Sequence, residues 1–426
     1  MTQPTDPVFY HQGELHMESC QIRALAEKMT TPFFCYSEAR LLDNVRRCKD
    51  AFESRGIRIH YAMKANSTLH VLRLLAEQGL GVDLVSGGEM QRALAAGFVG
   101  QHMILSGVGK TITELNAAIE TGVSQFNVES AEELALLTEL AEQKNVQVSV
   151  ALRVNPDVKV NTHKNITTGQ KGNKFGIDME QVAELTQLYA GNSHLIIEGL
   201  AIHIGSQICD TEPYRIAVGK MMNLVEQLEQ EGVEITRLDL GGGFGIDYGQ
   251  GTVLDFETIA EVISIETQYF KGTVIVEPGR SLVADTGVLV SRINYVKKAD
   301  PRTFVILDAG MNDLMRPALY QAVHPLVTVA EPKVGSTQEY DIVGPICEST
   351  DTFVRDYPLS DELRTGDLVV FLYTGAYCSV MNSSYNSRSI IPEIMVNGSK
   401  AKMIRRPITQ EKLMAFEQNV QELCLV

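Results

Sequence analysis

The chain has 426 residues, of which 44% are hydrophobic, so it can bury a large core and form one large domain with a second, smaller one. Acidic residues outnumber basic ones and give a formal net charge of −16, which argues against a broad electrostatic affinity for nucleic acid or for an anionic membrane surface. The opening MTQPTDPVFYHQGEL shows no targeting pattern, and no apolar run reaches the roughly 18 residues that span a bilayer, so we expect a cytoplasmic protein.

Cysteine usage is consistent with a reducing compartment. Seven cysteines are scattered along the chain, and no two of them form a C-x-x-C pair. An odd number at irregular spacing fits neither a disulfide framework nor a zinc site. We therefore expect free thiols and no metal site.

The N-terminal segment, residues 1–35, predicts a hairpin followed by a short helix within PVFYHQGELHMESCQIRALAEKM. We expect this segment to join a β-domain formed by the last part of the chain.

Residues 36–285 repeat one unit, in which a short β-branched run is followed by a turn and an amphipathic helical stretch such as STLHVLRLLAEQG or SAEELALLTELAEQ. Alternating strands and helices imply a parallel sheet, and eight units match a closed (β/α)8 barrel better than an open sheet. The predicted strands begin near Ile57, Gly81, Met103, Gln125, Ser149, Ile197, Arg237 and Val274.

Two other stretches depart from this repeat. The long connection after Asn155, PDVKVNTHKNITTGQKGNKFGI, predicts a functional loop above the fifth strand. In residues 286–426 the helical periodicity fades, and GVLVSRINYVKKA, RTFVILDAG, EYDIVGP and DLVVFLYTGAY are typical of antiparallel strands separated by turns. We expect a second, mostly antiparallel β-domain there.

Polar residues mark the ends of the predicted barrel strands. Because active sites of this fold lie at the carboxyl ends of the strands, we expect these side chains to converge on one face. They are Lys64, Asp83 with Ser86, Asn127 with Glu129, Arg153, His203 with Ser206, Gly241 to Gly243, and Glu277 with Arg280.

The glycine run in LDLGGGFG follows a strand and could let backbone N–H groups approach a phosphate. It does not satisfy G-x-G-x-x-G, and by itself it fits an ordinary tight turn equally well. Arg280 in EPGR and Ser206 in HIGSQ favour the phosphate cradle, because both side chains can bind an anion.

A phosphate-bearing cofactor opposite a half-buried lysine suggests pyridoxal phosphate, since a desolvated lysine loses its proton readily and reacts with an aldehyde. Lys64 is the candidate, although a lone barrel lysine is more often ion-paired. Glu277 could keep the pyridine nitrogen protonated. His203 could lie flat against the ring, whereas a lone histidine is more often a satisfied core residue.

These motifs together resemble the fold-type III pyridoxal-phosphate-dependent decarboxylases. The resemblance runs from TPFFCYSEARL to GAYCSVMNSSYNSR and includes YAMKAN, GVDLVSGGE, TTGQKGNKFGI, HIGSQ, LGGGFG, EPGR, MNDLMRPALY and GPICESTD. It implies an alanine-racemase-like (β/α)8 barrel joined to a β-domain, and a homodimer whose active sites lie at the subunit interface.

Position by position, the resemblance implies that Lys64 bonds to the cofactor aldehyde, that His203 stacks on the ring and that Glu277 meets its nitrogen. Cys347 is implied as the acid that protonates the α-carbon after carbon dioxide leaves. The implied cofactor contacts are Asp83, Arg153, Ser206, Gly241, Gly242, Gly243, Pro278, Gly279, Arg280 and Tyr377. The implied substrate contacts are Arg280, Arg316, Tyr320, Glu348 and Tyr377, with Cys347 and Glu348 reaching in from the other subunit.

The substrate implied by the resemblance is meso-2,6-diaminopimelate, which would yield L-lysine and carbon dioxide. Its distal amino-acid centre requires a cation and an anion, and Arg316 and Glu348 supply that pair, unless RPALY is only a surface turn. The alternative is a decarboxylase of another basic amino acid, of the lysine or ornithine type. A racemase would weaken the electron sink, which Glu277 strengthens, and a non-catalytic cofactor carrier would lack the β-domain.

Overall fold

The computed structural model describes residues 7–158, 174–249, 251, 253–333 and 335–418. They divide into two compact units, Leu42–Leu282 and the combination of Met1–Leu41 with Val283–Val426. We call the first the barrel unit and the second the β-unit, and we describe each by itself.

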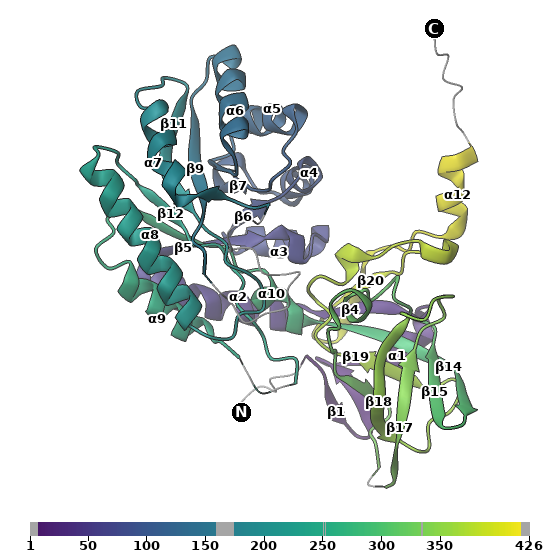
Figure 1. Ribbon diagram of the computed structural model, residues 1–426. Coiled ribbons are helices and arrows are strands. Elements are labelled where there is room, and N and C mark those ends of the chain that lie inside the picture. Colours follow the sequence, from purple (N-terminus) through teal and green to yellow (C-terminus); the bar gives the residue numbers. More distant parts are fainter. Residues whose placement is uncertain (1–6, 159–173, 250, 252, 334, 419–426) are drawn as a thin grey trace. The chain divides into compact units, whose positions relative to one another are not determined.

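The barrel unit is a closed sheet of parallel strands. Each strand pairs with the next along the chain, and the parallel pairing of Val274 with Ile57 joins the last strand to the first. This arrangement confirms the predicted (β/α)8 barrel (Figure 1). The barrel strands are β5 (Ile57–Ala62), β6 (Gly81–Leu84), β7 (Met103–Leu105), β8 (Gln125–Val128), β9 (Val148–Asn155), β11 (Leu195–Ala201), β12 (Arg237–Asp239) and β13 (Thr273–Val276), with the short β10 (Ile177–Asp178) added beside β9.

The helices of the barrel unit lie outside the strands (Figure 1). Their starts follow local capping chemistry: Ser86 and Ser130 accept hydrogen bonds from the backbone three residues on, and Thr111 forms a capping box with Glu114. The helices are α2 (Glu38–Phe52), α3 (Leu69–Glu77), α4 (Gly87–Ala96), α5 (Ile112–Thr121), α6 (Ala131–Lys144), α7 (Met179–Leu188), α8 (Glu212–Gln230), α9 (Phe256–Glu266) and α10 (Arg280–Val283); α2 and α10 cross the boundaries between the units.

The β-unit is built on a mixed sheet in which most neighbours are antiparallel, as expected, while β15 with β17 and β4 with β20 pair in parallel. A small sheet and helix α1 come from the N-terminal segment. The sheet strands are β4 (Phe33–Ser37), β14 (Gly287–Ala299), β15 (Arg302–Leu307), β16 (Leu326–Thr328), β17 (Thr337–Val343), β18 (Thr352–Ser360), β19 (Leu368–Phe371), β20 (Glu393–Asn397) and β21 (Lys400–Arg405). The remaining elements are β1 (Phe9–His11), β2 (Glu14–Met17), β3 (Cys20–Gln21), α1 (Ile22–Lys28), α11 (Arg316–Tyr320) and α12 (Gln410–Gln418).

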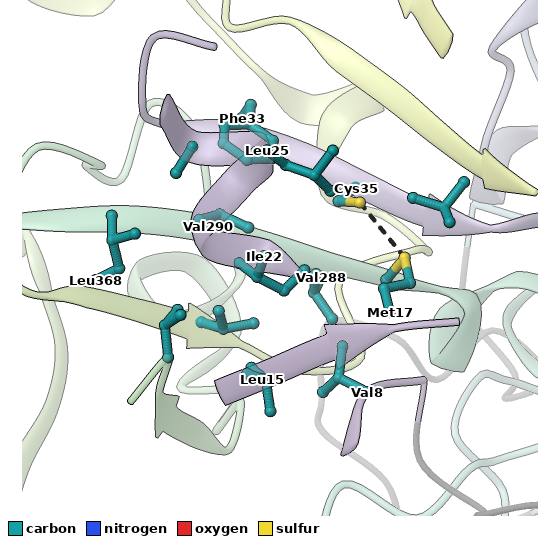
Figure 2. Close-up of a cluster of buried hydrophobic side chains, with 14 of the residues drawn as sticks. Val8, Leu15, Met17, Ile22, Leu25, Phe33, Cys35, Val288, Val290 and Leu368 are labelled. Atoms are coloured by element: carbon teal, nitrogen blue, oxygen red, sulfur yellow. Dashed lines mark hydrogen bonds between the residues drawn. The ribbon is translucent and has the colours of Figure 1, made fainter. Parts of the chain in front are cut away.

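One apolar cluster joins the two ends of the chain inside the β-unit (Figure 2). Leu15 and Phe33 from the N-terminal segment pack with Val288 and Val290 of β14 and with Leu368 of β19. All five side chains are buried, so their removal from water stabilises the association of segments that are far apart in sequence.

None of the helices in the described parts of the chain is both long and apolar enough to cross a membrane.

Candidate active site

A cavity of about 430 Å³ lies among the carboxyl ends of the barrel strands. Six side chains that the sequence places at strand ends line it: Lys64, Asp83, Asn127, Arg153, His203 and Glu277. The cavity therefore combines a lysine, a histidine and two carboxyl groups in a space suited to a small organic molecule.

Lys64 follows β5 in a single 3-10 turn, Met63–Ala65. Its Nζ lies 3.3 Å from Oδ2 of Asp83, and its side chain is 34% exposed while that of Asp83 is buried. The turn is held against the end of β13, because the backbone N–H of Ala62 donates to the carbonyl oxygen of Pro278 (3.1 Å). At Gly279 a Cβ would lie 3.1 Å from that of Ala62, so the lysine turn and this backbone pack closely.

Glu277 follows β13 and is almost fully buried. Burial raises the pKa of its carboxyl group well above the usual range, and the charges of Asp239 and Asp83 raise this pKa further, while Lys64 opposes them. Burial also raises the pKa of Asp239, so the two neighbouring carboxyl groups retain a proton more readily than exposed ones. Oε1 of Glu277 is buried and has no hydrogen-bond partner among the described residues.

Asp239 accepts hydrogen bonds from three donors. Nδ2 of Asn127 (3.0 Å) and Nε2 of Gln125 (3.3 Å) donate to Oδ2, and the backbone N–H of Gly241 (3.0 Å) donates to Oδ1. Sequence reasoning did not assign Asp239 or Gln125 to the site, and it noted Asn127 only as a strand end. The available signal was a polar side chain in a short strand of the predicted barrel, which must find partners when it is buried.

The glycine run begins with Gly241 in the left-handed region (φ +63°). A Cβ at Gly242 would collide with the carbonyl oxygen of Glu277, so only glycine fits this close backbone approach. The N–H of Gly242 also donates to Nδ1 of His203 (3.3 Å). The glycine backbone thus packs directly against two of the predicted site residues.

His203 is neutral in this setting. Burial lowers the pKa of its imidazole well below the usual range, and the positive charges of Lys64 and Arg153 lower it further. Since Nδ1 accepts the hydrogen bond from Gly242, the proton of the neutral ring is on Nε2.

Arg280 is buried beside the glycine run. Its Nη2 donates to Oγ of Ser206 (3.0 Å), and its Nη1 donates to the hydroxyl oxygen of Tyr248 (2.8 Å). A guanidinium, a hydroxyl and a glycine backbone are the groups that bind phosphate in proteins. Tyr248 was not anticipated, because it lies in a loop with no distinctive pattern.

Arg153, on β9, forms an ion pair with Glu129 (2.6 Å), and its guanidinium carbon lies 4.8 Å from the ring centroid of Phe175. Glu129 also accepts a hydrogen bond from the backbone of Gly176 (3.0 Å). The end of the predicted loop after Asn155 is thereby fixed to β9, whereas residues 159–173 of that loop lie outside the described residues.

The remaining predicted site residues belong to the β-unit. Arg316 begins α11 and is buried, with Nη1 2.8 Å from Nε2 of His324, and Tyr320 ends the same helix. Tyr377 has φ +56° in the segment after β19. Sequence reasoning missed His324, since a single histidine between a short helix and a strand carries no signal of its own.

Cys347 and Glu348 lie on an exposed loop of the β-unit. The backbone N–H of Cys347 donates to Oδ1 of Asn386 (3.0 Å). Glu348 accepts hydrogen bonds from Oγ1 of Thr350 (2.7 Å) and from the hydroxyl of Tyr385 (3.0 Å), which lower the pKa of its carboxyl group and keep it ionised.

Asp351 connects this loop to the segment that leads to Arg316. Its Oδ2 accepts from the N–H of Ile346 and its Oδ1 from the N–H of Met311, both at 2.6 Å. The buried carboxylate therefore fixes the loop that bears Cys347 and Glu348 relative to the start of α11.

Comparison with known proteins agrees with this geometry. Residues 38–284 match the family model described as the pyridoxal-binding domain of pyridoxal-dependent decarboxylases. A diaminopimelate decarboxylase from Zymomonas mobilis is 39% identical over 422 residues, covering 98% of this chain and 100% of its own. The crystal structure of diaminopimelate decarboxylase from Helicobacter pylori complexed with L-lysine is 37% identical, with a TM-score of 0.89, covering 93% of this chain and 99% of its own. A lysine decarboxylase from Selenomonas ruminantium is more distant, at 26% identity and a TM-score of 0.79, covering 90% and 97% of the two chains.

Replacing Gly242 with alanine should weaken the binding of pyridoxal phosphate by about tenfold or more, because the added Cβ would displace either the glycine run or the backbone of Glu277. The dissociation constant can be measured by absorbance titration of the cofactor-free protein. Gly219→Ala on α8, where a Cβ meets only a side-chain atom at 3.8 Å, is the matched control and should bind normally. Equal affinity of both variants would show that this backbone approach does not matter for the cofactor.

Proposed function

The chain belongs to the pyridoxal-dependent decarboxylases and, within them, to the diaminopimelate decarboxylases. On this premise we propose how its residues convert meso-2,6-diaminopimelate to L-lysine and carbon dioxide. The observation that carries the proposal is the barrel cavity, in which Lys64 faces the same space as the buried carboxyl group of Glu277. A reactive amine would bind the cofactor aldehyde, and a carboxyl group that holds a proton would strengthen its electron sink, so both support decarboxylation with this cofactor.

The barrel unit fits pyridoxal phosphate at three points. The glycine run with Ser206 and Arg280 suits the phosphate, Lys64 suits the aldehyde, and the buried Oε1 of Glu277, which lacks a partner among the described residues, suits the ring nitrogen. When bound, pyridoxal phosphate supplies an electron sink for the pair of electrons that stays on the α-carbon as carbon dioxide leaves.

Glu277 and Asp239 together determine the protonation of Glu277. The raised pKa of Glu277 favours its protonated form, and we assign its Oε1 to the place where the ring nitrogen of bound cofactor would share that proton. Asp239, held by Asn127 and Gln125, adds to this effect, because its charge raises the pKa of Glu277. His203 supplies a neutral, flat surface for the ring, and Asp83 orients the amine of Lys64.

The β-unit residues complete the proposal on the substrate side. We assign Arg316 to the distal carboxylate, Glu348 to the distal ammonium group, and Tyr320 and Tyr377 to the remaining substrate contacts. Cys347 delivers the proton to the α-carbon after carbon dioxide has left. The ionised state of Glu348 and the exposure of the Cys347 loop support these assignments.

We also propose that two copies of the chain form a homodimer in which Cys347 and Glu348 act in the site of the other subunit. Exposure of both residues in the single chain supports this, because a proton donor in a decarboxylase needs a surrounding that excludes water. A partner subunit would supply that surrounding.

Glu277→Gln should keep the cofactor bound but lower kcat by about a hundredfold or more, since an amide cannot hold the ring nitrogen protonated. The measurement is turnover at saturating meso-diaminopimelate, with cofactor content read from absorbance. Unchanged turnover in a fully loaded variant would remove Glu277 from the proposed proton site.

The unaltered enzyme should prefer meso-diaminopimelate to L-lysine and L-ornithine by roughly a thousandfold in kcat/KM, because a buried guanidinium left without its anion is costly. Arg316→Met should reduce this preference by impairing the good substrate far more than the poor ones. Equal or better use of L-lysine or L-ornithine by the unaltered protein would instead favour a decarboxylase of another basic amino acid.

Lys64→Ala and Cys347→Ala should each abolish nearly all activity. Refolding the two variants together should restore part of it, because a mixed dimer contains one site with neither substitution when the cysteine comes from the other subunit. Activity is compared with that of each variant refolded alone. If mixed dimers form, as shown by differently tagged chains, and no activity returns, Cys347 acts within its own subunit.

A further inference from the structure

Arg316 and His324 form a buried pair within the β-unit. The two residues are only 6% and 3% exposed, and Nη1 of Arg316 lies 2.8 Å from Nε2 of His324. On the other side of the imidazole, Nδ1 of His324 lies 2.9 Å from the carbonyl oxygen of Leu372, directly after β19. The ring therefore bridges the guanidinium and the backbone.

The two contacts determine the protonation of the ring. A guanidinium can only donate hydrogen bonds, so Nε2 must accept, and a carbonyl oxygen can only accept, so Nδ1 must donate. His324 is consequently neutral with its proton on Nδ1. It orients the guanidinium without adding a charge that would compete with a bound carboxylate.

The backbone on both sides of the ring is fixed by the sheet. The N–H of Leu372 donates to the carbonyl oxygen of Pro325 (2.8 Å), and Leu326 of β16 pairs with Phe371 of β19. Helix α11, in contrast, has five residues, and the residue that follows it, Gln321, has φ +54°. Such a short helix gives little support to a long, flexible arginine side chain, and the sheet supplies that support through His324.

We propose that His324 is a positioning residue that determines substrate selectivity, because it holds the Arg316 guanidinium in the orientation that binds the distal carboxylate of meso-diaminopimelate. This inference rests on the proposed role of Arg316. Recognition of a carboxylate by a guanidinium depends on the orientation of its planar fork, so a guanidinium that rotates freely loses affinity for that group selectively.

Two substitutions of His324 each keep only one of the two hydrogen bonds that its imidazole ring makes. In His324→Gln the amide oxygen can occupy the place of Nε2 and accept from Arg316, whereas in His324→Asn the shorter amide can replace only Nδ1 and donate to Leu372. The variants have similar polarity, so a role limited to packing would not distinguish them.

KM for meso-diaminopimelate and the inhibition constant of L-lysine are measured in steady-state assays of each cofactor-loaded variant, with melting temperatures as the measure of stability. His324→Asn should weaken the binding of meso-diaminopimelate by about tenfold or more and that of L-lysine by less than about threefold. His324→Gln should bind both within about threefold of the unaltered enzyme. In the Arg316→Met background, His324→Asn should have no further effect on either ligand.

Three results would overturn the inference: normal binding of meso-diaminopimelate by His324→Asn, equal loss of affinity for both ligands in both variants, or a full effect of His324→Asn without Arg316. Failure of the proposed function is distinguishable, because the unaltered enzyme would then show no preference for meso-diaminopimelate over L-lysine. If His324→Asn does not fold, ¹⁵N spectra of the unaltered protein decide the matter, and a His324 proton on Nε2 would refute the arrangement.

Discussion

The hydrogen bond from Asn127 to Asp239 crosses the inside of the barrel, and the geometry of the cofactor side of the site depends on it. Asn127 lies on β8 and Asp239 on β12, which are not neighbours in the closed sheet. A buried carboxylate is costly unless donors compensate it, and Asn127, Gln125 and the backbone of Gly241 provide them. Burial raises the pKa of both Asp239 and the neighbouring Glu277, and the charge of Asp239 raises the pKa of Glu277 further.

The same arrangement links the two carboxyl-bearing residues to the glycine run. Gly241 donates to Asp239 and accepts from the N–H of Glu277 (2.7 Å), so the first glycine of the run is fixed by both carboxyl-bearing residues. The next glycine donates to His203. The first two glycines of the run thus contact Asp239, Glu277 and His203, and a shift in the glycine run would disturb all three contacts at once.

In the β-unit, too, buried hydrogen-bond acceptors hold site residues in place. Asp351 fixes the Cys347 loop by accepting two backbone hydrogen bonds, and His324 fixes Arg316 by accepting one from its side chain. Neither Asp351 nor His324 is itself assigned to the substrate. Each is a buried acceptor that holds a residue whose own local structure, an exposed loop or a short helix, provides little rigidity.

The sequence by itself determined the alternation of strands and helices and the closed barrel with its β-domain. It also determined the strand ends that carry Lys64, Asp83, His203 and Glu277. These features follow from local periodicity and from motifs that are contiguous in the chain. Only the tertiary structure decided that Asp239 meets Asn127 across the barrel, that Tyr248 contacts Arg280, and that His324 bridges Arg316 and Leu372. These contacts join residues far apart in the chain, or side chains with no repeating pattern. They depend on barrel closure and strand register, which fix distances that no local spacing of residues encodes.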